Sequence, residues 1–77
     1  MTPPGYPIVK PRQLIRALER MGFRLLRKSK GSHWQFEHPD GRRTTIPVRK
    51  GQDIGPGLLR KILRDIEINP KDLSNWL

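Results

Sequence analysis

A β-hairpin near the middle of the chain limits the folds that this sequence can adopt. Residues 32–38 alternate between polar and apolar side chains, which places Trp34 and Phe36 on one face of a strand. Residues 39–41, Pro-Asp-Gly, predict a tight turn because proline presets its φ angle and glycine accepts a positive one. Residues 42–48 then return as a second strand. Because one face of this hairpin is apolar, the remaining elements must cover it.

The segments on either side of the hairpin supply those elements. Residues 11–21 carry apolar side chains at helical spacing, begin with a proline and are followed by Gly22, a candidate C-cap. Residues 23–28 predict a further strand, although their alternation is imperfect, and residues 58–66 predict a second amphipathic helix. A short final helix is expected after Asn69. We therefore predict an α+β fold in which a three-stranded antiparallel sheet carries both long helices on one face.

Size and charge narrow the class of function. A chain of 77 residues forms one domain with a thin core, so any site must lie on an open surface. We expect this domain to cover residues 11–77 and the proline-rich residues 1–10 to form an extended arm. The 16 lysine and arginine residues exceed the 7 acidic ones, for a net charge of +9. This charge favours a nucleic-acid partner and also suits an acidic protein.

The sequence shows no mark of export or of membrane insertion. No run approaches the roughly 18 apolar residues of a membrane span, and the first residues lack the apolar core of a signal peptide. The chain contains no cysteine, so disulfides and thiolate metal ligands are excluded. We therefore expect a cytoplasmic protein that does not associate with membranes.

His33 is the candidate for chemistry. It shares its strand face with Gln35 and Glu37, and that face is open to solvent if the helices cover the other. An unperturbed histidine has a pKa of about 6.5 and can accept or donate a proton near neutral pH. On the residues alone, an exposed histidine without a role is the favoured interpretation. His38 has the opposite parity, which indicates a turn residue, and two histidines on opposite faces predict neither a metal site nor a cofactor.

Several basic residues and one helix start could bind phosphate groups. The cations on the turns and on the loop after the third strand are Lys28, Lys30, Arg42, Arg43, Arg49 and Lys50. Arginine suits phosphate because its planar guanidinium binds two oxygens at once, but a basic rim can also serve solubility alone. Residues 55–57 open the second helix, where free N–H groups can hold an anion, or they are simply loop glycines. We expect Trp34 and Phe36 to pack in the core rather than to stack on RNA bases.

Five motifs, in order, resemble those of the HicA (YcfA-type) toxins. They are Arg20-Met21-Gly22-Phe23, Lys30-Gly31-Ser32-His33 followed by Phe36, His38-Pro39-Asp40-Gly41, Ile46-Pro47-Val48 and the helix Gly57-Leu58-Leu59-Arg60-Lys61-Ile62-Leu63. The resemblance implies a double-stranded-RNA-binding-like fold, metal-independent cleavage of messenger RNA, and inhibition by a HicB-type antitoxin. It implies that His33 is catalytic, and Ser32 beside it joins the expected phosphate-binding residues. Two positions depart from the family pattern: Arg49, where members often carry histidine, and Leu58, where they often carry threonine.

Two other functions fit the same sequence. One is a non-catalytic RNA-binding module on this fold, because double-stranded-RNA-binding domains mostly read shape and phosphates. The other is a protein-interaction domain whose basic face serves only an acidic partner. Cleavage that depends on His33 distinguishes the toxin from both, and RNA binding at low salt distinguishes the RNA-binding module from the interaction domain.

Overall fold

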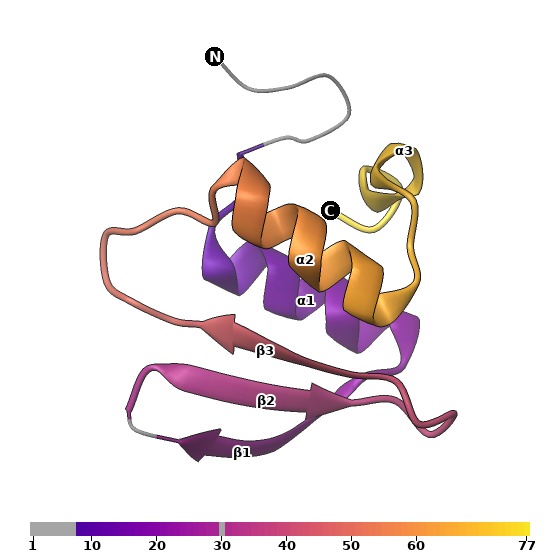
Figure 1. The fold of residues 1–77 in the computed structure, drawn as a ribbon, viewed down its shortest axis with the longest axis horizontal. Coiled ribbons are helices and arrows are strands. Elements are labelled where there is room, and N and C mark those ends of the chain that lie inside the picture. The colour runs from indigo at the N-terminus through magenta and orange to yellow at the C-terminus, as the bar shows by residue number, and fades with distance from the viewer. Residues whose placement is uncertain (1–7, 30) are drawn as a thin grey trace.

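The computed structural model describes residues 8–29 and 31–77 (Figure 1). Its elements follow one another as α1 (Pro11–Met21), β1 (Arg24–Ser29), β2 (His33–Glu37), β3 (Arg43–Pro47), α2 (Pro56–Ile66) and α3 (Pro70–Leu73). This order confirms the predicted α+β fold of the double-stranded-RNA-binding type. Gly22 ends α1 in the left-handed conformation, with φ at 102°, as predicted for a C-cap. None of the helices described is long and apolar enough to cross a membrane.

The three strands form one antiparallel sheet in the order β1-β2-β3. In Figure 1, α1 and α2 lie on the same side of this sheet, closest to β3, and β1 is the strand farthest from them. β3 is an edge strand, which suits Pro47 at its end because proline has no N–H to donate to a neighbouring strand.

The core lies between the two long helices and strands β2 and β3. Phe36 and Ile46 contribute to it from the sheet and are almost fully buried, as the alternation predicts. The helical side chains that complete it are Leu14, Leu18, Leu59, Ile62, Leu63, Ile66 and Leu73. Trp34 is only half-buried and packs against the rim of this core. The prediction that both aromatic residues face inward is therefore confirmed, with Phe36 in the centre and Trp34 at the margin.

β1 extends beyond the helical layer and is irregular. Its pairing with β2 shifts between Leu25 and Arg27, so that Leu26 is an extra residue in a β-bulge. Leu25 and Leu26 are both exposed, at 41% and 45%. The bulge is the physical reason for the imperfect alternation of the sequence in this strand.

The segment that precedes α1 is joined to the loop between β3 and α2. Val9 is buried, and its carbonyl accepts a hydrogen bond of 2.7 Å from the N–H of Ile54, which is also buried. The end of the expected N-terminal arm is thus packed into the domain. The rest of that arm, residues 1–7, lies outside the described residues.

Candidate active site

His33 is the first residue of β2, at the end of the sheet where the loop after β3 begins. The strand register places it between Ser29 of β1 and Pro47 of β3. Gly31, in the turn before it, has a φ of 69°, which favours glycine. The side chain of His33 is exposed, as the open-face prediction requires. The turn and the register together hold an accessible imidazole at the sheet end.

A shallow depression of about 320 Å³ surrounds His33. The strand ends contribute His33 and Pro47, and Leu58 comes from the first turn of α2. The remaining lining residues belong to the β3–α2 loop: Arg49, Gln52, Asp53 and Ile54. An imidazole, a guanidinium and a carboxylate therefore share one open hollow, which is the kind of surface site that a small domain can form.

The start of α2 adds a source of hydrogen-bond donors to this hollow. Gly55 is the N-cap of α2, and within the described chain no side chain bonds to the N–H groups of its first turn. Pro56 has no N–H, which leaves those of Gly57 and Leu58 available. Free N–H groups at a helix start favour a bound anion. The departure from the family pattern at Leu58 removes a side-chain hydroxyl but leaves these backbone donors in place.

The carboxylate of Asp53 is itself part of an ion pair. Lys10, immediately before α1, places its Nζ 3.6 Å from Oδ1 of Asp53. Both side chains are largely exposed, so the pair contributes little to stability. Asp53 is the single acidic side chain in the lining of the hollow, and Lys10 offsets its negative charge.

Some of the expected phosphate-binding residues lie near His33 and others do not. Arg49 lines the hollow, Lys50 follows it on the same loop, and Ser32 precedes His33 in the chain. Lys28 pairs with Trp34 across the strands, and its Nζ lies 4.0 Å from the centre of the indole ring. Since Trp34 faces the core side, Lys28 lies on the sheet face opposite His33. Lys30 lies outside the described residues.

Arg42 and Arg43 lie at the other end of the sheet. Arg43 pairs with Glu37, at the far end of β2, and its Nε donates a 2.6 Å hydrogen bond to the carboxylate of that residue. Four residue steps along a strand span about 13 Å, at roughly 3.3 Å per residue. The structure therefore does not bring these two arginines together with His33.

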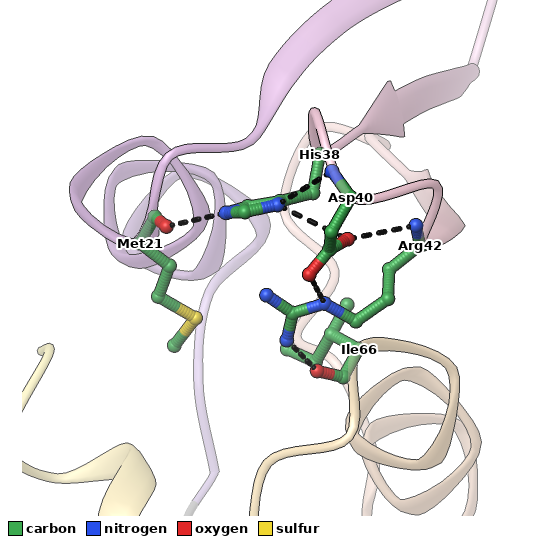
Figure 2. A network of polar contacts seen from close by, with 5 residues as sticks. All are labelled: Met21, His38, Asp40, Arg42 and Ile66. Atoms are coloured by element: carbon green, nitrogen blue, oxygen red, sulfur yellow. Dashed lines mark hydrogen bonds and ion pairs between the residues drawn. The ribbon is translucent and has the colours of Figure 1, made fainter.

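His38 and Arg42 instead connect the β2–β3 hairpin to the helices (Figure 2). Nε2 of His38 is 3.1 Å from the carbonyl oxygen of Met21, so this nitrogen carries the proton and donates it. Nδ1 of His38 accepts a hydrogen bond from the N–H of Asp40. Arg42 donates to the carboxylate of Asp40 at 2.8 Å and to the carbonyl of Ile66 at the end of α2. His38 is a turn residue, as predicted, and Arg42 is engaged within the protein.

The Asp40 carboxylate makes this hairpin sensitive to acid. The backbone N–H of Arg42, and then its guanidinium, hold the pKa of Asp40 below its ordinary value of 3.8. A carboxyl with a lowered pKa in the folded state stabilises the protein above its unfolded pKa, and this stability is lost as the pH falls through the folded value. We expect Asp40→Asn to weaken the fall in unfolding free energy between pH 5 and pH 2, measured by urea denaturation. The control Glu19→Gln, on the exposed face of α1, should leave that fall unchanged; equal curves for parent and Asp40→Asn would contradict the prediction.

The sequence interpretation missed three polar residues of this region. Gln52 and Asp53 come to His33 through the fold of the β3–α2 loop, and no pattern in the sequence predicts that approach. Arg27 lies on the His33 face of the sheet, where its Nε donates to Oε1 of Gln35 at 3.3 Å. The consecutive Leu25 and Leu26 break the alternation of β1, and this break could have indicated the bulge. The bulge in turn would have placed Arg27 on the same face as His33.

Comparison with known families agrees with this architecture. A family model described as the HicA toxin of bacterial toxin–antitoxin systems matches residues 11–68. The chain belongs to the HicA toxin family. No curated protein matches the chain significantly. The family match contains all three strands, both long helices and every residue that lines the hollow around His33, so the candidate site lies wholly within the part that defines the family. Within residues 8–29 and 31–77, no three histidine or carboxylate side chains gather in a way that could hold a metal ion.

Proposed function

We propose that this HicA-family toxin is an endoribonuclease that cleaves messenger RNA in the cytoplasm, with His33 as its catalytic residue. The observation that carries the proposal is the exposed imidazole of His33 in an open hollow that also contains Arg49 and the uncapped start of α2. A general acid or base, a cation and free backbone donors are the groups that metal-independent RNA cleavage needs.

The proposed reaction uses the RNA's own 2′-hydroxyl as the nucleophile. A base removes its proton, the 2′-oxygen forms a bond to the adjacent phosphorus, and the bond from phosphorus to the 5′-oxygen of the next nucleotide breaks. That 5′-oxygen takes up a proton as it leaves. The products are a 2′,3′-cyclic phosphate and a 5′-hydroxyl, and neither an oxidant nor a metal is consumed. His33 is the side chain of the hollow suited to the first proton transfer or, in the other assignment, to the last.

The remaining groups of the hollow suit the charge that develops on the phosphate. The guanidinium of Arg49 can bind two phosphate oxygens at once. The N–H groups of Gly57 and Leu58 come from a helix start and favour negative charge. Negative charge builds up on the phosphate oxygens in the transition state. Donors that are fixed opposite those oxygens therefore stabilise the transition state more than they stabilise the substrate.

The partner that keeps this activity silent is, in our proposal, a HicB-type antitoxin. The hollow is open, so an inhibitor need not enter a deep pocket to block it. The toxin has a net charge of +9, and an acidic surface placed over the sheet end would meet the basic residues there. Complementary charge of this kind also accelerates association.

The chemistry of the cleaved ends tests the proposal. We expect the purified toxin to cleave a defined transcript in the presence of EDTA and to leave 2′,3′-cyclic phosphate and 5′-hydroxyl ends, measured by end-specific labelling and mass spectrometry. The proposed reaction needs no added metal and always leaves a 5′-hydroxyl, whereas water can later open the cyclic phosphate to a 2′- or 3′-monophosphate. Cleavage that stops with EDTA, or products with 5′-phosphate ends, would show that a different reaction operates.

A further inference from the structure

A second cleft opens beside the His33 hollow, between the start of α1 and the β3–α2 loop. It encloses about 470 Å³. Lys10 and Arg12 border it on the helix side, and Arg49 and Lys50 border it on the loop side. All four side chains are exposed. We call this the α1 cleft.

The two sides of the α1 cleft are held together by the backbone. The hydrogen bond from Ile54 to Val9 links the loop to the segment that leads directly into Lys10. Both bridging residues are buried in the core, at 2% exposure for Val9 and 1% for Ile54. The loop is therefore fixed against the segment that leads into α1. The cations of the two segments face one cleft, and this backbone contact holds its two sides together.

The charge of the α1 cleft is strongly positive. Within residues 8–29 and 31–77, Arg12, Arg49 and Lys50 have no carboxylate in ion-pair contact, and Lys10 alone is paired, with Asp53. The first turn of α1, which is described in full, contains no acidic residue. Three unpaired cations around one cleft form a site for a chain of negative charges.

The α1 cleft lies next to the His33 hollow, because Arg49 and Gln52 line both. Pro11 and Val48, which are largely buried, add apolar surface to the cleft lining. Cations at the rim and apolar groups below suit a nucleotide, whose phosphate is charged and whose ribose and base have apolar faces. An acidic protein surface would use the cations but would not need a cleft.

We propose that the α1 cleft binds the backbone of single-stranded RNA that flanks the nucleotide at His33. This inference rests on the proposed ribonuclease function, and it adds Lys10 and Arg12, at the opposite wall from the loop, to the RNA-binding surface. RNA then runs from the sheet end, past the shared Arg49, towards the start of α1.

Binding measurements on paired double variants test the proposal. The probe is a fluorescent single-stranded RNA of about ten nucleotides with 2′-O-methyl groups, which removes the nucleophile and prevents cleavage. We expect Lys10→Gln with Arg12→Gln to weaken binding about tenfold at low salt and to reduce the log–log salt slope by about 1.4, at roughly 0.7 for each phosphate that the protein no longer neutralises. The matched control Arg60→Gln with Arg64→Gln also removes two positive charges, but from the exposed face of α2, where neither residue lines the α1 cleft. It should change the affinity less than twofold.

The possible results distinguish the cleft assignment from its alternatives. Equal decreases in affinity for the two double variants would show that net charge alone governs binding and would overturn the proposal. Weaker binding to the antitoxin instead of to RNA would make the cleft a protein-docking surface and would also overturn it. If the parent neither binds nor cleaves RNA, the ribonuclease proposal fails together with this one. If the parent cleaves RNA and the cleft variants match their control, only the cleft assignment is wrong.

Discussion

Replacing His33 with alanine is expected to reduce RNA cleavage by about 10²- to 10⁴-fold, the usual contribution of a general acid or base. The thermal unfolding midpoint should not fall, because the side chain of His33 is exposed and its backbone, not its ring, makes the contacts of β2. Initial rates on a labelled transcript and a circular-dichroism melt measure the two effects. Growth arrest on expression should disappear in parallel.

The other histidine provides the matched control. His38 contacts the carbonyl of Met21 and the N–H of Asp40, and its ring lies edge-on to Phe23 with centroids 5.0 Å apart. His38→Ala should therefore lower the unfolding free energy by about 1–3 kcal/mol, because it removes a part-buried hydrogen bond to Met21 and the ring contact with Phe23. It should keep near-parental cleavage at temperatures where the variant is folded. A His33→Ala protein that cleaves RNA at close to the parental rate would contradict the assignment of the catalytic residue.

The helices and strands whose apolar side chains recur at a regular spacing could be predicted from the sequence. Their predicted bounds are close to the observed ones. The hairpin follows from strict alternation around Phe36 and from Pro-Asp-Gly, both of which are local features. α1 follows from a proline start and the glycine stop at Gly22, which the structure places in the left-handed conformation. In each case the local preference and the final packing agree.

The candidate site could be predicted only in part, because its members meet through tertiary structure. His33 follows from strand parity and from the family motif, whereas Asp53 and Gln52 reach it through the path of a loop. The count of basic residues in the sequence also says nothing about their partners. The sequence does not distinguish the role of Arg42 from that of Arg49. In the structure, Arg42 bonds to Asp40 and to α2, whereas Arg49 lies in the open hollow.

The inhibited complex is expected to bury His33. In the free toxin, the imidazole is exposed at the rim of an open hollow that no other part of the described chain closes, so a modifying reagent can reach it. An antitoxin that blocks RNA by occupying this hollow must remove that access. We therefore expect diethyl pyrocarbonate to modify His33 at least about tenfold more slowly in the complex. Each factor of ten in this rate corresponds to a difference on the order of 1.4 kcal/mol in the free energy needed to expose His33 to the reagent.

His38 serves as the internal reference for this measurement. It is the only other histidine in the chain, and both of its ring nitrogens are engaged within the protein, by Met21 and by Asp40. Its modification should be slow in the free toxin and should change little on binding, whereas protection of His33 should follow the loss of ribonuclease activity as antitoxin is added. Peptide mapping by mass spectrometry separates the two histidines. If His33 reacts at the same rate in a fully inhibited complex, direct coverage of the site is wrong, and the antitoxin must act from another face by distorting the sheet end.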